Sequence, residues 1–286
     1  MNTIPVPGDA EAFAELARHS SVIPERTSSP DAARELVAEF GAAILTGVHP
    51  LDDNHARDAA VAVVGETLVV APDVYTVIVH DGDARMQISE HLPDRLLALD
   101  MHSDGYSYGD SLPDWLFLGC ESQAAYGGGS ILIDSYAVIA CLRDAGGIWA
   151  EMVEMLETVP IDQIPAFQPR GLSPCIQRTP QGRLFVRRNV FQRVADDAPP
   201  GPVTDRHNVL IEHWHALWSL LSRSAIPFRL QPGELLCIDN YRLGHGRLPF
   251  VGTPRTFQRV WAWTSDALEI PAGMPPVADW QTVPTL

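Results

Sequence analysis

Two residues with the chemistry of metal ligands stand two positions apart in the middle of the chain. His102 and Asp104 flank Ser103, and in an extended or turn segment residues two apart point to the same side. An imidazole and a carboxylate placed in this way can reach one point in space. The spacing alone is weak evidence, because the chain has 10 histidines and 36 acidic residues. A loop histidine beside a solvated aspartate is the alternative.

A third candidate ligand, His245, lies far along the chain. It is flanked by Gly244 and Gly246 and follows a strand-like run that ends in a polar turn at 239–242. Two histidines and one carboxylate on one face of an octahedron leave three positions open, which is the arrangement of non-haem iron(II) oxygenases. Open positions are needed when a bidentate co-substrate and dioxygen must both bind.

Two arginines follow His245 on a predicted strand. Arg255 and Arg259 are four positions apart, so they share one face of that strand. A planar guanidinium binds a carboxylate through two parallel hydrogen bonds, which lysine cannot do. We therefore predict that these arginines bind carboxylates, with a surface position for one of them as the alternative.

Taken in order, these motifs resemble those of the taurine dioxygenase and clavaminate synthase superfamily of iron(II)/2-oxoglutarate oxygenases. The similarity includes the His-x-Asp motif, the distal histidine and the arginines after it. It also includes the glycine turn 127–129 that leads into Ser130, and the run 39–45, which is similar to the family's opening helix and strand. The resemblance extends over roughly residues 30 to 265.

The resemblance implies that His102, Asp104 and His245 bind iron(II). It implies that Arg255 and Ser130 bind the distal carboxylate of 2-oxoglutarate, and that Arg259 faces this co-substrate or the substrate. The implied reaction uses dioxygen to hydroxylate an unactivated C–H bond of a small polar metabolite, either an amino acid or a nucleotide-like compound, and releases succinate and carbon dioxide. Desaturation and cyclisation stay open, whereas the aspartate disfavours chlorination.

Two further groups are candidates for substrate binding. Arginines at 183, 187, 188 and 193 form the one basic cluster of an acidic chain, and Arg188 and Arg193 are the predicted anion-binding members. A solvated hairpin that balances Asp196 and Asp197 is the alternative. Tyr106 and Tyr108 follow the first motif, and in an extended segment at most one of them would face the metal.

Two other functions use the same three candidate ligands. A zinc-dependent hydrolase would use them, but it would leave Ser130, Arg255 and Arg259 without a role. A non-catalytic jelly-roll protein that binds small molecules has no need for three ligands in register. Succinate production from 2-oxoglutarate separates the oxygenase from both.

The surrounding elements predict a mostly β fold with helical decoration around a double-stranded β-helix (jelly roll). We expect a single domain over residues 1–286, with a core at about 30–265 and an insertion at about 140–230 that covers the active site. Glycine and proline punctuation with apolar periodicity predicts helices at 30–40, 135–157 and 204–224, the last capped by Thr204. Strands are predicted at 42–47, 75–79 (before the turn Asp81-Gly82), 115–120, 130–134, 234–239 and 256–263, with a hairpin at 178–187.

Composition limits the class of protein. Hydrophobic residues make up 46% of the 286 residues, enough for a sizeable core. The net charge of −16 disfavours nucleic-acid polymers and anionic membranes. The four cysteines form no C-x-x-C pair, and no secretory signal is visible, so we expect a cytoplasmic protein. A small molecule is the expected partner, and a homo-oligomer is possible.

Overall fold

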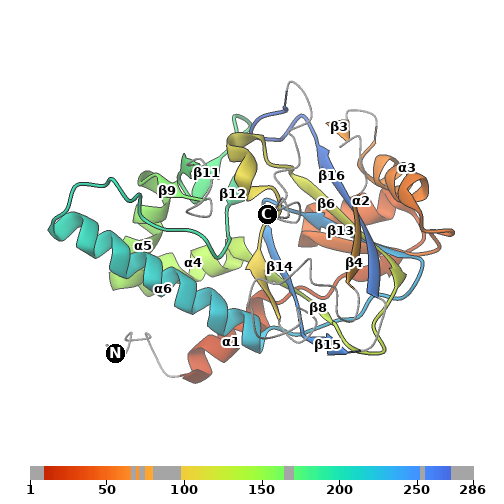
Figure 1. The fold of residues 1–286 in the computed structure, drawn as a ribbon, viewed down its shortest axis with the longest axis horizontal. Helices are drawn as coiled ribbons and strands as arrows, with labels where there is room; N and C mark the ends of the chain where they lie inside the picture. Colours follow the sequence, from red (N-terminus) through yellow and green to blue (C-terminus); the bar gives the residue numbers. More distant parts are fainter. Residues whose placement is uncertain are drawn as a thin grey trace, which may run out of the picture.

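The fold consists of two facing sheets enclosed by helices (Figure 1). The structure is a computed structural model that describes residues 10–65, 69–70, 75–79, 98–163, 171–251 and 255–271. Its helices are α1 (Ala10–Ser20), α2 (Pro30–Phe40), α3 (Asp53–Val64), the 3-10 helix η3 (Tyr106–Ser111), α4 (Ser135–Ala145), α5 (Gly147–Thr158) and α6 (Pro202–Ser224). Among the described helices, none has both the length and the apolar character needed to cross a membrane.

The larger sheet has seven strands. Its order is β1 (Glu25–Thr27), β2 (Ala42–Leu45), β13 (Glu234–Asp239), β6 (Trp115–Ser122), β16 (Arg255–Trp263) and β3 (Val69–Val70), with β4 (Tyr75–Val79) also paired to β16. β1 runs parallel to β2, and the other pairings are antiparallel.

The smaller sheet carries the candidate metal ligands. Its three strands are β5 (Leu99–His102), β14 (Leu243–Arg247) and β8 (Ser130–Asp134), with β14 in the middle. Short two-stranded ladders join β7 (Tyr126–Gly127) to β15 (Phe250–Val251), β9 (Ile161–Asp162) to β10 (Leu172–Ser173), and β11 (Ile176–Arg178) to β12 (Leu184–Val186).

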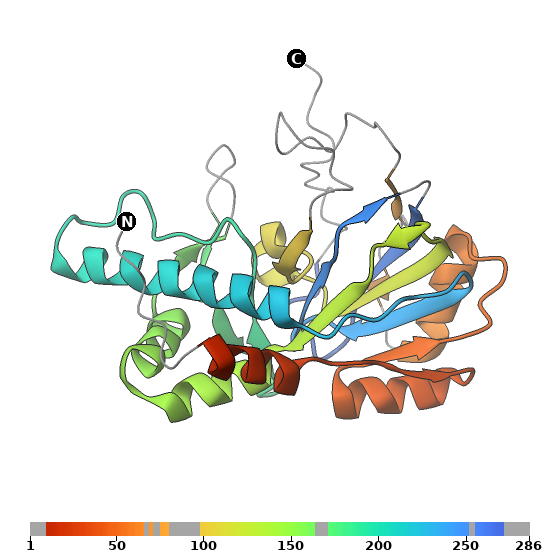
Figure 2. The same cartoon turned by 90° about the horizontal axis from the view of Figure 1, so that it is seen from below.

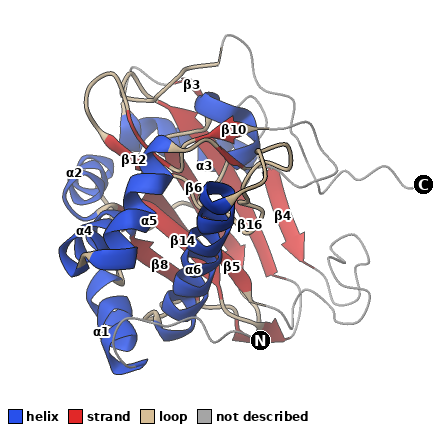
Figure 3. Cartoon of the chain, turned by 90° about the vertical axis from the view of Figure 1, so that its left-hand side faces the viewer, coloured by secondary structure: helices blue, strands red, loops and turns tan. Residues whose placement is uncertain are grey.

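Alternation along the strands divides the apolar side chains into three layers. On β16, Trp261 and Trp263 belong to the core between the sheets, whereas Val260 and Ala262 face α2 and α3 on the outer side of the larger sheet. On β8, Leu132 enters the core between the sheets, and its neighbours pack with α1, α4, α5 and α6. Figures 2 and 3 show these helices outside the smaller sheet. Because successive side chains of a strand point to opposite faces, only every second residue of β8 and β16 can face the space between the sheets.

Local signals explain both ends of α2. The Ser29 hydroxyl accepts a hydrogen bond from the Ala32 amide, Pro30 opens α2, and Gly41 ends it with φ 86°. The strands at 75–79 and 234–239 have the predicted bounds, and the hairpin at 178–187 is present as β11 and β12. The turn Asp81-Gly82 lies outside the described residues.

Three expectations are wrong in detail. The helix expected at 135–157 is two helices, because Gly146 and Gly147 both have positive φ. The last helix begins at Pro202, and the Thr204 hydroxyl donates to the Pro199 carbonyl instead of capping it. The described helices also span more residues than the described strands, so the protein has mixed sheets with helices rather than a mostly β composition.

A candidate metal centre and neighbouring buried arginines

Backbone pairing in the smaller sheet brings the three candidate ligands together. His245 on β14 pairs directly with His102 on β5, and Asp104 follows two residues after the end of β5. Asp104 Oδ1 lies 3.3 Å from His102 Nε2 and 3.6 Å from His245 Nε2. In the part of the chain that the structure describes, these are the only three ligand-type residues gathered in this way, with one ligand atom of each within 4.8 Å of the others.

Asp104 is held as a buried carboxylate. Its side chain is 6% exposed, and burial by itself raises the pKa of a carboxyl group. The positive charge of the Arg259 guanidinium, followed by the close approach of the His102 and His245 imidazoles, outweighs burial and holds the pKa of Asp104 well below its usual range. An ionised carboxylate is the form that a divalent metal requires.

The two histidines present ring nitrogens suited to a metal. His102 Nδ1 donates to the Asp100 backbone carbonyl at 2.8 Å, which leaves Nε2 as the nitrogen with the lone pair. Burial, followed by the charge of His102, lowers the pKa of His245, so its imidazole is neutral at pH 7. A neutral His, an ionised Asp and a second His with a fixed tautomer fit an iron(II) ion.

Asn240, which the sequence analysis missed, fastens the Asp104 peptide. Its Oδ1 accepts from the Asp104 amide at 2.9 Å, and its Nδ2 donates to the carbonyls of Asp104 at 3.0 Å and Pro113 at 2.7 Å. The side chain is fully buried. Asn240 lies in the turn before β14, and it thus holds the loop that follows β5. This contact links the segment that carries His245 to the segment that carries Asp104.

Arg255 is a buried cation on β16, with its guanidinium over the Phe257 ring at 3.8 Å. Its guanidinium is buried, Nε donates to Gln123 Oε1 at 3.2 Å, and its other N–H groups have no partner among the described residues. Burial, then the charge of Arg247, lowers the pKa of Arg255 to about 9. A buried cation without an anion is costly, so the Arg255 guanidinium is suited to an anionic ligand.

Strand register and a shared aromatic ring relate Arg255 to the histidines. Arg247 stands opposite Ser130, and His245 stands opposite Leu132, two residues along the same ladder. Two residues span about 7 Å of strand, a reach that fits a five-carbon dicarboxylate. Arg247 and Arg255 both lie over the Phe250 ring, at 4.6 Å and 5.9 Å. The structure therefore adds Arg247, two residues after His245 on the same strand face, to the predicted pair Ser130 and Arg255.

The segment after the first motif is not extended. Tyr106 and Tyr108 lie on η3, so the expected alternation of the two rings does not apply. Burial, then the charge of Asp104, raises the pKa of Tyr106 to about 12, and its ring lies 5.8 Å from the ring of Phe191. The Tyr108 ring packs edge-on against Trp261 at 5.5 Å. Both tyrosines thus border residues of the centre.

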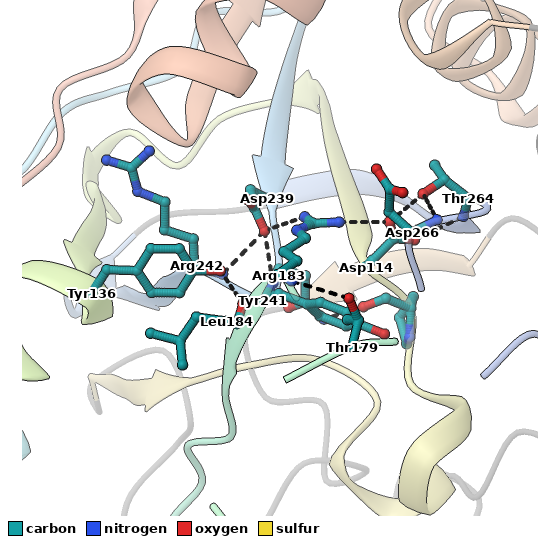
Figure 4. Close-up of polar contacts among 12 residues, drawn as sticks. Asp114, Tyr136, Thr179, Arg183, Leu184, Asp239, Tyr241, Arg242, Thr264 and Asp266 are labelled. Atoms are coloured by element: carbon teal, nitrogen blue, oxygen red, sulfur yellow. Dashed lines mark hydrogen bonds and ion pairs between the residues drawn. The ribbon is translucent and has the colours of Figure 1, made fainter. Parts of the chain in front are cut away.

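Carboxylates distant in the sequence neutralise most of the basic cluster. Figure 4 shows Arg183 between Asp114, at 2.9 Å, and Asp239, at 2.6 Å. Arg187 pairs with Asp110, and Arg193 pairs with Asp162 at 2.5 Å. The cluster is therefore not a solvated hairpin, and the guanidinium of Arg193 is held by a buried aspartate.

Arg188 differs from the other members of the cluster. It is 4% exposed, and its Nε and Nη1 have no hydrogen-bond partner within the described part of the chain. Burial lowers the pKa of Arg188 to about 10. Its backbone carbonyl accepts from the amide of Ser103 at 2.8 Å, so it lies beside the peptide between two candidate ligands. A buried guanidinium with N–H groups that lack partners among the described residues is suited to binding an anion.

Comparison with known families gives one match along most of the chain. Residues 17–261 match the family described as taurine catabolism dioxygenase TauD, TfdA family. A mitochondrial trimethyllysine dioxygenase from Bos taurus is 28% identical over 172 residues, which cover 54% of this chain and 38% of that enzyme. The chain therefore matches less than half the length of this relative.

Solved structures share the fold. An asparagine oxygenase in complex with Fe(II), 2S,3S-3-hydroxyasparagine and succinate superposes with a TM-score of 0.56 at 19% identity, covering 90% of both chains. The non-haem iron oxygenase OrfP, in complex with Fe, succinate and (3S)-hydroxy-L-Arg, gives 0.53 at 17% identity, covering 92% of this chain and 94% of that one.

Proposed function

This chain belongs to the TauD/TfdA family of dioxygenases, and from that premise we propose that it is an iron(II)- and 2-oxoglutarate-dependent oxygenase of a small polar metabolite. One observation carries the proposal. The same structure holds a His102, Asp104 and His245 group and an Arg255 that is buried without a carboxylate partner among the described residues. A zinc hydrolase gives no role to that arginine, and a simple binding protein has no need for three metal ligands in register.

Each residue has a task in this proposal. His102, Asp104 and His245 would hold iron(II), and Arg255 with Ser130 would bind the distal carboxylate of 2-oxoglutarate. When bound, iron(II) with 2-oxoglutarate and dioxygen supplies the oxidation of a substrate C–H bond, and 2-oxoglutarate leaves as succinate and carbon dioxide. The guanidinium of Arg255 orients the co-substrate by its forked geometry, and its burial strengthens the attraction.

Residues around the candidate metal centre would exclude water from it. Tyr106 from η3 and Phe191 from the long connection before α6 are in ring contact, which supports the assignment of about 140–230 as an insertion covering the active site.

We also assign the seven-stranded and three-stranded sheets to the two halves of a double-stranded β-helix. Their shared apolar core supports this assignment.

Among substrates, we favour an amino acid. The products bound in the asparagine oxygenase and OrfP structures are hydroxylated amino acids, and trimethyllysine is an amino acid as well. Two cations would attract a substrate carboxylate. One is Arg259, with one nitrogen 3.4 Å from Asp104 Oδ2, and the other is Arg188, whose buried guanidinium has no carboxylate within hydrogen-bond distance among the described residues. Arg193 is not included, because Asp162 already holds it.

A substrate panel tests the proposal. Amino acids and nucleotides are incubated with the protein, iron(II), 2-oxoglutarate and air, and succinate and product masses are recorded. We expect succinate formation that requires iron and increases with one amino acid, whose mass rises by one oxygen or falls by two hydrogens. Absence of succinate with every compound, combined with hydrolysis in the presence of zinc, would replace the oxygenase by the hydrolase.

A further inference from the structure

The two oxygens of the Asp104 carboxylate have different surroundings. Oδ1 faces the two imidazoles, at 3.3 Å from His102 Nε2 and 3.6 Å from His245 Nε2. Oδ2 points the other way and accepts the indole N–H of Trp261 at 2.8 Å. Arg259 Nη1 lies 3.4 Å from the same oxygen. One oxygen is thus directed to the candidate metal and the other to two donors.

The two donors come from one face of one strand. Arg259 and Trp261 are two residues apart on β16, so their side chains project to the same side. The Arg259 guanidinium lies over the Trp261 ring at 4.6 Å, and Trp261 is 8% exposed. A buried indole N–H with a charged acceptor is a strong and directional contact.

We propose that Trp261, supported by Arg259, is a positioning residue that keeps Asp104 bound to the metal through one oxygen only. This inference rests on the proposed function, because it concerns the same iron site. Hydrogen bonding occupies Oδ2, and rotation of the carboxylate to offer both oxygens would break two contacts in a buried environment. The positions left open by two histidines and one oxygen then remain available to the co-substrate and dioxygen.

The sequence supplies a matched control on the same strand face. Trp263 is also buried, and its indole N–H donates at 2.8 Å, but its acceptor is the Ser111 backbone carbonyl. Trp261→Phe and Trp263→Phe therefore remove the same chemical group from neighbouring positions. Only the first removes a hydrogen bond from the candidate metal ligand.

Infrared difference spectra of the protein with and without Zn(II) report the binding mode directly. The separation between the antisymmetric and symmetric stretches of a metal-bound carboxylate is wide when one oxygen binds and narrow when both bind. Asp104→Asn identifies the bands. We expect a wide separation for the wild type and Trp263→Phe, and a narrow one for Trp261→Phe.

The kinetic constants kcat and KM are the second measurement. Trp261→Phe should lower kcat by about tenfold or more, as loss of a contact to a metal ligand does, with the KM for 2-oxoglutarate changed less than about threefold. Trp263→Phe should change both constants by less than about threefold. A wide separation with Trp261→Phe, a narrow one in the wild type, or equal effects of the two variants would overturn the proposal.

A second variant and a measurement with the metal alone address misfolding and lack of turnover. If Trp261→Phe unfolds the strand, benzothienylalanine at 261 keeps the two-ring shape and replaces only the N–H, and the same outcomes apply. The infrared measurement needs the metal alone, so it is separate from turnover. A wild type with a wide separation that never forms succinate would contradict the proposed function while leaving the role of Trp261 intact.

Discussion

His245 lies directly across an antiparallel ladder from His102, with their ring centroids 4.2 Å apart. The backbone hydrogen bonds of β5 and β14 therefore fix the distance between the two imidazoles before any metal binds. A slip of one residue in this register would turn one imidazole to the opposite face of the sheet. Strand pairing in the smaller sheet therefore sets the relative position of the two imidazoles.

Arg255→Gln should weaken 2-oxoglutarate binding. A hydrogen bond to a charged group contributes about 1.5–3 kcal/mol, so we expect the dissociation constant to rise by about tenfold or more. Arg255→Lys should recover little, because an ammonium cannot form the forked pair. Anaerobic titration of the iron-loaded protein measures this constant. The exposed Arg223→Gln is the control, and an unchanged constant for Arg255→Gln would remove this residue from the co-substrate site.

Asn240→Ala should destabilise the protein and its metal site together. The substitution leaves the buried amide and carbonyl of Asp104 without their partners, at a cost of about 1–3 kcal/mol for each unsatisfied group. Urea unfolding should show a loss of about 3 kcal/mol, and Co(II) affinity should fall with it. Exposed Asn54→Ala should change neither quantity. Full stability of Asn240→Ala would contradict the structural role.

Arg183→Met should be among the more damaging substitutions outside the centre. Asp114 is fully buried, and burial raises its pKa against the opposing effect of Arg183. Removing the arginine leaves that carboxylate unpaired, which costs about 3–5 kcal/mol. Adding Asp114→Asn should restore part of the loss in urea unfolding. Arg178→Met, at an exposed position of the same hairpin, serves as the comparison, and equal effects of both arginines would refute the prediction.

Acidification should destabilise the metal-free protein through His215. Burial, then the charge of Arg188, lowers the pKa of His215 from its ordinary 6.5. The unfolded chain therefore binds this proton more readily, so stability rises with pH in this range and falls as the pH drops below about 6.5. Urea unfolding at about pH 7.5 and about pH 5.5 should show a smaller difference for His215→Asn than for the wild type. An equal difference would exclude His215 as a cause.

The sequence predicts elements well where local signals are strong. Ser29, Pro30 and Gly41 delimit α2, and the apolar run of β13 has the expected bounds. The pairing of β5 with β14 could not be read from the sequence, because no local signal specifies which distant strands share hydrogen bonds. The 3-10 helix that carries Tyr106 was missed for a related reason, since contacts with Phe191 and Trp261 stabilise its two tyrosines.

Side-chain partners were the least predictable part of the site. The basic cluster pairs with Asp110, Asp114, Asp162 and Asp239 rather than with its neighbours Asp196 and Asp197 alone. Trp261 lies inside the strand predicted at 256–263, and no sequence signal indicates that its indole donates to Asp104. The proximity of His102, Asp104 and His245 is now a structural finding, whereas their metal-binding role stays a prediction.

In the proposed function, these three side chains share one iron(II) ion with 2-oxoglutarate. Anaerobic addition of iron(II) to the protein with 2-oxoglutarate should produce a metal-to-ligand charge-transfer absorption that saturates at one iron per chain. His245→Ala should abolish this absorption, and His55→Ala, which changes an exposed histidine, should preserve it. Failure of the wild type to develop the absorption, or its persistence in His245→Ala, would contradict the account.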